Sequence, residues 1–191
     1  MTRAVFLDRD GTINDEAGYI NHMDRFRLLP RVEKAIRAFN ELGFATVVIT
    51  NQGGVAKGFF TETFLKKLHL TMIKELRRKG AKIDAVYYCP HHPHGSVKAY
   101  SVRCRCRKPS DELVKSAIKE LGLVLDGSYI IGDQKRDIEF GRKLGLTTIL
   151  VKTGYGKGEI IFKKFNGYES PDYVADDLYD ASKWILKREG Y

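Results

Sequence analysis

The sequence predicts an α/β fold in which a mainly parallel sheet carries helices on both faces. Short apolar segments alternate along the chain with amphipathic ones. Arg3–Asp8 and Phe44–Thr50 are apolar runs of strand length, as in buried parallel strands. Between them, apolar residues spaced by three or four positions in Arg31–Leu42 indicate a helix. Such alternation is typical of a three-layer sandwich, because right-handed crossovers place helices on both faces of the sheet.

The remaining elements follow the same rule. Gly43 ends the first helix, and Thr61 is a suitable N-cap for a long helix that ends at Gly80. Ser110 is expected to cap the helix after it, which carries an apolar face from Leu113 onward. Further strands are predicted at Ile83–Tyr88, Ser128–Gly132, Leu146–Val151 and Tyr173–Ala175, and further helices at Ile138–Leu144 and Leu178–Leu186.

Length and composition indicate a single domain that spans residues 1–191. The chain is 43% hydrophobic, which is too apolar for a disordered protein. No apolar run approaches the ~20 residues that a membrane helix needs. The first residues, Met1 and the strand after it, do not resemble a signal peptide, so we expect a cytoplasmic protein.

The charge balance is basic, with 33 Lys and Arg residues against 24 Asp and Glu residues and a net charge of +9. These side chains are spread along the whole chain, which favours an ordinary lysine-rich surface. Attraction of an anionic substrate is the second interpretation, and nucleic-acid binding the third. We expect neither a nucleic-acid nor a membrane partner, and we expect a monomer because no helix shows a clear exposed apolar stripe.

Chemically informative residues follow the predicted strands, where α/β folds place their sites. Asp8 and Asp10 leave the first strand together, with Gly11 allowing a sharp turn after them. Two close carboxylates repel each other, so a site that keeps both needs a cation or a proton. An EF-hand is excluded because its closing Glu would fall at Tyr19. Asp133 and Asp137 repeat the pattern after a later strand.

Two further positions complete this set. Thr50 ends the second strand, where its hydroxyl and the backbone N–H groups that follow can bind a phosphate oxygen. Lys108 lies just before a predicted helix and can neutralise an anion. Each feature alone is a weak signal. In order, an Asp pair, a Thr, a Lys and Gly132-Asp133…Asp137 form a specific pattern.

This pattern resembles the haloacid dehalogenase-like (HAD) phosphatase superfamily, which has a Rossmann-like fold. The resemblance implies that Asp8 is the nucleophile and that Asp10 protonates the leaving alcohol and then activates water. It implies that Thr50 and Lys108 hold the phosphoryl oxygens. Asp8, Asp133 and the backbone carbonyl of Asp10 are then expected to hold a catalytic Mg²⁺, as hard oxygen ligands. Asp137 is expected to support that metal indirectly.

All three cysteines lie in one long segment without periodicity, Pro90–Arg107 and the residue before it. The order is Cys89-Pro90-His91-His92-Pro93-His94, then Cys104-Arg105-Cys106. An odd number of cysteines argues against a disulfide framework, and clustered Cys and His suit a tetrahedral Zn²⁺. Four protein ligands would close such a site, so we expect a structural metal. The spacing alone does not choose among His91, His92 and His94.

The loop resembles those of the D-glycero-D-manno-heptose 1,7-bisphosphate 7-phosphatases and the related histidinol-phosphate phosphatases. Both groups carry Cys-x-His and Cys-x-Cys-Arg-Lys-Pro, with zinc on three Cys and one His. The resemblance therefore places structural Zn²⁺ on Cys89, His91, Cys104 and Cys106, in a zinc loop spanning residues 89–108. It also implies that Asn51, Gln52, Gly53 and Arg107 bind substrate.

Two features favour the heptose group over the histidinol group. The gap between His91 and Cys104 is long, and the segment from Thr50 to Phe60 matches the heptose pattern. The implied activity is removal of the 7-phosphate from a small phosphorylated sugar, in a pathway to lipopolysaccharide core or surface glycan. The alternatives are a histidinol-phosphate or other small phosphomonoester phosphatase and, less favoured, a non-catalytic zinc-loop binding protein. One departure is Gln134, where the family usually has Lys or Arg, and Lys135 is expected to point elsewhere.

Two other structures are excluded by spacing. No large cap domain fits between the motifs, so an open site is expected, with loops supplying specificity. The glycine-rich stretch Gly154–Gly158 lacks the spacing of a phosphate-binding P-loop and is predicted to be an ordinary loop.

Overall fold

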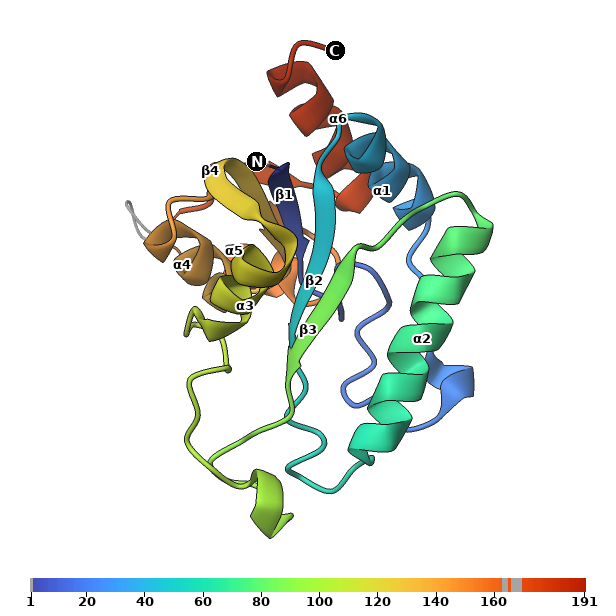
Figure 1. The fold of residues 1–191 in the computed structure, drawn as a ribbon, viewed down its shortest axis with the longest axis vertical. Helices are drawn as coiled ribbons and strands as arrows, with labels where there is room; N and C mark the ends of the chain where they lie inside the picture. The colour runs from blue at the N-terminus through green and yellow to red at the C-terminus, as the bar shows by residue number, and fades with distance from the viewer. Residues whose placement is uncertain (1, 163–164, 166–169) are drawn as a thin grey trace.

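The structure is a computed structural model that describes residues 2–162, 165 and 170–191 (Figure 1). Within this part of the chain, six parallel strands form one sheet in the order β3-β2-β1-β4-β5-β6. The strands are β1 (Thr2–Leu7), β2 (Ala45–Asn51), β3 (Ala85–Cys89), β4 (Leu123–Gly132), β5 (Thr147–Val151) and β6 (Tyr173–Ala175).

Helices cover both faces of the sheet, as predicted (Figure 1). One face carries α1 (Val32–Glu41), α2 (Glu62–Arg78) and α6 (Leu178–Arg188), and the other carries α3 (Glu112–Leu121) and α4 (Lys135–Lys143). A short helix α5 (Gly156–Ile161) follows β5, and single 3₁₀ turns form at Met23–Arg25 and Lys98–Tyr100. No large cap domain interrupts the described residues, so the predicted α/β fold class is confirmed.

Alternate residues of the central strands explain why two apolar layers form. Val5 and Leu7 of β1 face the α1, α2 and α6 side, whereas Ala4 and Phe6 face the α3 and α4 side. All four side chains are fully buried. Strand side chains alternate between faces, so a strand buried on both sides must be apolar throughout. The buried part of β1 is therefore apolar, and the polar site residues begin directly after it, at Asp8.

Of the two predicted N-caps, the structure confirms Thr61 and corrects Ser110. Thr61 accepts a hydrogen bond from the Phe64 backbone N–H at 3.1 Å, as an N-cap does. Ser110 does not cap α3, because that helix starts at Glu112 and Asp111 occupies the N-cap position. The prediction for Ser110 was wrong by one residue.

Two other predictions need correction. Strand β4 starts at Leu123, five residues before the predicted start, because Thr2 and Arg3 pair with Leu123 and Val124 before the register shifts. The predicted loop at Gly154–Gly158 instead contains the first turn of α5. Gly156 packs so closely on the Val151 carbonyl oxygen that a Cβ would lie 1.8 Å from it, so only glycine fits there.

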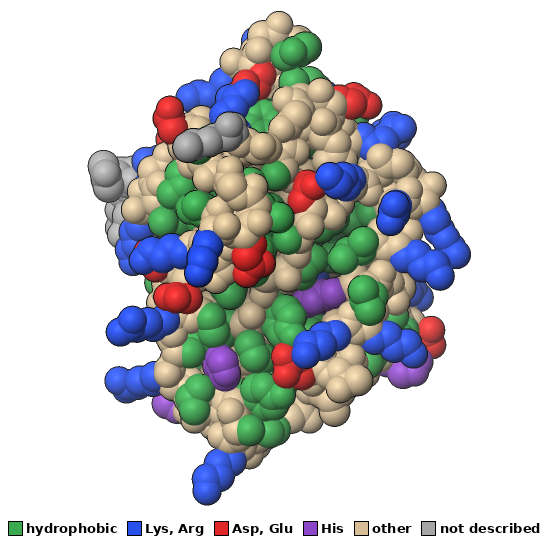
Figure 2. Space-filling view, in the orientation of Figure 1, with side chains coloured by type: hydrophobic (Ala, Val, Ile, Leu, Met, Phe, Trp, Pro, Cys, Tyr) green, Lys and Arg blue, Asp and Glu red, His purple; other side chains and the backbone are tan. Residues whose placement is uncertain are grey.

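The basic side chains are spread over the surface. In Figure 2, Lys and Arg side chains lie along both sides of the visible face, with Asp and Glu side chains among them. Many form exposed ion pairs, such as Lys82 with Asp84 at 2.6 Å. In the part of the chain that the structure describes, no helix is both long and apolar enough to cross a membrane.

Truncation of a buried α1 side chain is expected to destabilise the protein. Phe39 of α1 is fully buried against the sheet. Phe39→Ala should lower the free energy of unfolding by about 3–5 kcal/mol, because it removes apolar burial and leaves a cavity. Urea denaturation measures this loss. Leu70→Ala on the exposed side of α2, where the side chain is 67% exposed, should change stability by about 0.5 kcal/mol or less. Equal losses in the two variants would contradict this account of the core.

Candidate active site and metal centres

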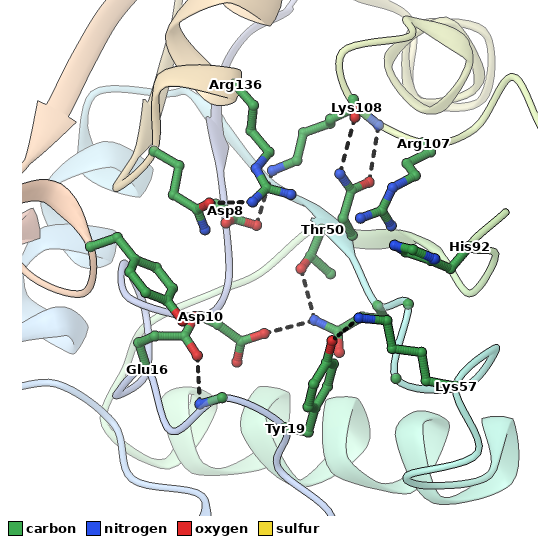
Figure 3. A pocket seen from close by; sticks show the side chains of 17 residues that line it. Asp8, Asp10, Glu16, Tyr19, Thr50, Lys57, His92, Arg107, Lys108 and Arg136 are labelled. Atoms are coloured by element: carbon green, nitrogen blue, oxygen red, sulfur yellow. Dashed lines mark hydrogen bonds and ion pairs between the residues drawn. The ribbon is translucent and has the colours of Figure 1, made fainter. Parts of the chain in front are cut away.

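The residues predicted to carry the chemistry meet in one cavity at the carboxyl ends of the strands (Figure 3). Its volume is about 450 Å³. Asp8 follows β1, Thr50 ends β2, and Lys108 enters from the long loop after β3. Parallel strands bring their carboxyl ends to the same edge, which is why residues more than one hundred positions apart in the sequence share one pocket.

A buried lysine joins two carboxylates beside the cavity. The Lys108 Nζ atom lies 2.6 Å from Asp137 Oδ1 and 3.0 Å from Asp8 Oδ1. Burial lowers the pKa of Lys108, but the negative charges of Asp137 and Asp8 outweigh it and the net shift is upward. Lys108 therefore stays protonated. It relieves the repulsion between Asp8 and Asp137, whereas the sequence predicted a cation for Asp8 and Asp10.

Asp133 is the third carboxylate of this cluster and is completely buried. One of its oxygens, Oδ2, accepts a hydrogen bond from the Tyr155 backbone N–H at 2.8 Å. Gly11 and Gly154, both with positive φ, make room for it, because a Cβ on either would lie 2.2 Å from Asp133 Oδ2. Burial, together with the charges of Asp8 and Asp137, raises the pKa of Asp133 to about 8.

Asp8, Asp133 and Asp137 fit a hard divalent cation. Each offers an oxygen within 4.8 Å of the others. Asp133 Oδ1 is buried and accepts no hydrogen bond from the described residues, whereas the buried Asp8 Oδ1 has Lys108 Nζ at 3.0 Å. Buried carboxylate oxygens are the ligands that Mg²⁺ prefers, and a further cation would relieve the repulsion between the carboxylates. Asp137 differs because Lys108 and the Gln134 backbone N–H occupy its two oxygens.

The Asp10 side chain points away from this cluster and into a hydrogen-bonded cage. Arg9 donates to both of its oxygens, at 2.7 and 2.8 Å, while Asn14 and Gln52 donate at 2.9 and 2.8 Å. Burial raises the pKa of Asp10, but the Arg9 charge and these hydrogen bonds outweigh it and lower the pKa overall. The cage holds the carboxyl group in one orientation at the edge of the cavity.

The residues after β2 position other site residues. The Asn51 side-chain amide makes two hydrogen bonds to the Lys108 backbone. It donates to the carbonyl oxygen at 3.2 Å and accepts from the N–H at 3.0 Å. Gln52 donates to Thr50 Oγ1 at 2.9 Å as well as to Asp10. Both line the cavity. Their amide groups are thus already engaged with the protein, and their direct contact with substrate stays a prediction.

Two cationic side chains and a histidine line the side of the cavity away from Asp8. Figure 3 shows Arg107, His92 and Lys57 along that side. Gly53 lies against the first two, since a Cβ there would come within 3.3 Å of both side chains. Arg107 also donates to the His91 backbone carbonyl at 3.3 Å. The pocket therefore has a cation on each side: Lys108, paired with Asp8 and Asp137, on one, and Arg107 on the other.

Several residues that line the cavity were not predicted as site residues. These are Glu16, Tyr19, Lys57, His92, Gln134, Arg136 and Tyr155. All but Arg136, which lies in α4, come from segments outside the helices and strands, and only the proximity of these segments to the motifs could have indicated them. Burial and the nearby Asp10 charge raise the pKa of Glu16 to about 7. Lys57 donates to the Tyr19 hydroxyl at 2.7 Å, which joins two walls of the pocket.

The two basic residues after Gln134 point in different directions. Lys135 points elsewhere, toward Glu139 on the same helix at 3.6 Å. Arg136 instead extends into the cavity and donates to the Gln134 side-chain oxygen (Figure 3). A cation is therefore present at this wall, although it comes from two positions further along the chain.

The cysteines form a second candidate metal centre, at the end of β3 and in the loop that follows it. Cys89, His91, Cys104 and Cys106 each offer a ligand atom within 4.8 Å of the others. His91 Nδ1 lies 3.2 Å from Cys106 Sγ, and the sulfur atoms of Cys89 and Cys106 are 3.1 Å apart. Three thiols and one imidazole in this arrangement can hold a tetrahedral Zn²⁺. His92 and His94 lie outside the cluster, so the alternatives left by spacing reduce to His91.

Comparison with known proteins agrees with this geometry. A HAD-hydrolase-like family model matches residues 105–181. The D-glycero-beta-D-manno-heptose-1,7-bisphosphate 7-phosphatase of Yersinia pestis is 38% identical over 97% of this chain and 96% of its own length. The chain belongs to this phosphatase family. The Escherichia coli K12 member is 41% identical over 97% of this chain and 95% of its own.

A solved structure of the same heptose bisphosphate phosphatase family superimposes closely. The D,D-heptose 1,7-bisphosphate phosphatase of B. bronchiseptica, complexed with magnesium and phosphate, has a TM-score of 0.85 and 27% sequence identity. The match covers 98% of this chain and 99% of that one. The resemblance inferred from the four motifs and the cysteine loop is confirmed, and so is the HAD-like fold.

The buried position of Lys108 generates a stability prediction. Lys108→Met would leave the Asp8 and Asp137 carboxylates buried without their cation, which should cost about 3–5 kcal/mol. Urea denaturation without added metal measures the loss. Lys82→Met, which removes an exposed partner of Asp84, is the matched control and should cost about 1 kcal/mol or less. A Lys108 variant as stable as this control would contradict the proposed role of the charge.

Proposed function

We propose that the chain removes the 7-phosphate from D-glycero-beta-D-manno-heptose 1,7-bisphosphate and releases heptose 1-phosphate and inorganic phosphate. Similarity to phosphatases of this specificity over nearly the full chain supports the proposal. The observation that carries it is a cavity with a cation at each end, Lys108 beside Asp8 and Arg107 on the opposite side. A substrate with two phosphates has a charge to place at each end.

Asp8 is the nucleophile in this proposal. Its carboxylate attacks phosphorus, the bond from phosphorus to the sugar oxygen breaks, and an aspartyl-phosphate forms. Lys108, 3.0 Å from Asp8 Oδ1, offsets the negative charge of the arriving phosphoryl group. Thr50 binds a phosphoryl oxygen from the end of β2. Asn51 fixes the Lys108 backbone and so keeps this cation in place.

Asp10 transfers the protons of both half-reactions. The negative charge of a bound phosphate raises the pKa of a neighbouring carboxyl, so Asp10 can take up the proton that it then gives to the leaving sugar oxygen. In the second half-reaction the Asp10 carboxylate removes a proton from water as its oxygen attacks the phosphorus bound to Asp8. The bond from phosphorus to Asp8 breaks, phosphate leaves, and Asp8 is regenerated.

Mg²⁺ is the proposed catalytic metal. Asp8, Asp133 and the backbone carbonyl of Asp10 would hold it, and Asp137 would support it through Lys108. When bound, it would neutralise charge on the phosphoryl group and allow two anions to approach each other. The unpartnered Oδ1 atom of Asp133, within reach of the Asp8 carboxylate, supports this assignment.

Arg107 is the proposed ligand of the phosphate that the substrate retains, with Lys57 and His92 beside it. A pocket that holds the 1-phosphate in this way directs the 7-phosphate toward Asp8. Histidinol phosphate has a single phosphate and leaves the Arg107 end without a partner charge, so this alternative is not favoured. Selection of the beta anomer is proposed from the names of the relatives.

Zn²⁺ is the proposed metal of the cysteine cluster, with a structural role. Three thiols and His91 would complete four ligands and leave no position for substrate. The same loop carries Arg107, which is tied to the His91 backbone. The metal would thus hold the loop that presents Arg107 to the cavity. A monomeric state, a cytoplasmic location and the absence of nucleic-acid and membrane partners stay predictions.

Phosphate release tests the function. With Mg²⁺, the beta anomer of heptose 1,7-bisphosphate should give a kcat/KM at least ~100-fold higher than histidinol phosphate, which is about 2.7 kcal/mol of transition-state discrimination. The alpha anomer should fall between the two. Asp8→Asn should abolish turnover of all three, because an amide is not a nucleophile here. A preference for histidinol phosphate would overturn the proposed substrate while leaving the phosphatase chemistry intact.

The cysteine cluster gives a second test. His91→Gln should lose about one equivalent of zinc per chain and raise the KM for the bisphosphate, because the loop that carries Arg107 loosens. His94→Gln is the matched control, since His94 is exposed and lies outside the cluster. Metal analysis of the purified proteins measures the difference. If both variants keep the zinc of the unmodified protein, His91 is not a ligand.

A further inference from the structure

A histidine on α2 contacts the catalytic machinery from behind. His69 is buried, with 5% of its surface exposed, and its Nε2 atom lies 3.0 Å from Arg9 NH1. The two residues are 60 positions apart in the sequence. Neither the four motifs nor the metal clusters include His69. Its ring lies beside Tyr88 of β3, with the ring centroids 5.3 Å apart.

The hydrogen bond fixes the chemical state of His69. A guanidinium group has only donors, so Arg9 must donate and His69 Nε2 must accept. The imidazole is therefore neutral, with its proton on Nδ1. The environment agrees, because burial and then the Arg9 charge lower the pKa of His69 to about 3. His69 thus offers a permanent acceptor across the physiological pH range.

Arg9 links His69 to Asp10 by hydrogen bonds to both. Its side chain is about 2% exposed and uses its other N–H groups on Asp10 and Gln52. His69 holds the far side of the guanidinium, so the planar group cannot rotate away from the Asp10 carboxyl. A buried Arg9 N–H without His69 would lack a partner, which costs free energy and favours a rearrangement of Arg9.

We propose that His69 is a positioning residue, which holds Arg9 against Asp10 and thereby keeps the Asp10 carboxyl in line with the leaving oxygen of the substrate. The inference rests on the proposed role of Asp10 as proton donor. It predicts an effect on proton donation that loss of packing alone would not produce. The long helix α2 then supports the catalytic loop and also covers one face of the sheet.

The test compares two leaving groups. A sugar alkoxide needs a proton as it leaves, whereas p-nitrophenolate is a good leaving group without one. For His69→Leu, we expect kcat/KM to fall about tenfold or more with heptose 1,7-bisphosphate and by less than about threefold with p-nitrophenyl phosphate. His69→Gln keeps an acceptor and should restore kcat/KM for the bisphosphate to within about threefold of the unmodified protein.

Controls separate positioning from packing. Met72 lies one turn further along α2 and is fully buried, so Met72→Ala should lower stability while changing kcat/KM for the two substrates equally. His69→Asn, whose acceptor is too short to reach Arg9, replaces the Leu variant if that protein does not fold. Equal losses with both substrates, or a Gln variant as impaired as the Leu or Asn variant, would overturn the inference. Failure of the unmodified protein to hydrolyse either phosphate would instead refute the proposed function, and the inference with it.

Discussion

The site depends on one electrostatic constraint: three buried carboxylates share one edge of the sheet. Asp8, Asp133 and Asp137 would repel one another, and only Lys108 among the described residues is placed to form ion pairs with two of them. The remaining negative charge makes the cluster a receptor for a cation and a phosphate together. Gly11 and Gly154 keep the space that Asp133 needs. The repulsion between these buried carboxylates is thus relieved when a cation binds.

Each face of the site is supported by a separate part of the fold. Asn51 at the end of β2 fixes the Lys108 backbone, and Arg9 fixes Asp10 with His69 of α2 behind it. The cysteine cluster lies in the loop that carries Arg107. The reacting groups are therefore held by hydrogen bonds to rigid elements, which is how a pocket without a large cap domain can keep its geometry.

Much of this architecture could be predicted from the sequence, because strand-length apolar runs end in the polar residues that form the site. Asp8, Thr50, Lys108 and Asp133 meet as expected, and the four zinc-ligand candidates lie together. The start of β4 was missed because Asp126 and Gly127 have the composition of a turn, and pairing with Thr2 and Arg3 overrides it. Arg136, Glu16 and His69 could not be predicted as site residues, since their roles depend on loop and helix positions far away in the sequence.

In the proposed reaction, Asp8 carries the phosphoryl group during turnover. Rapid quenching of the protein with heptose 1,7-bisphosphate and Mg²⁺, followed by peptide mass spectrometry, tests it directly. The account predicts a transient acyl phosphate on the peptide that contains Asp8, appearing before phosphate release and absent in Asp8→Asn. Phosphate release at full rate with no phosphorylated peptide, or with the phosphoryl group on another residue, would contradict it.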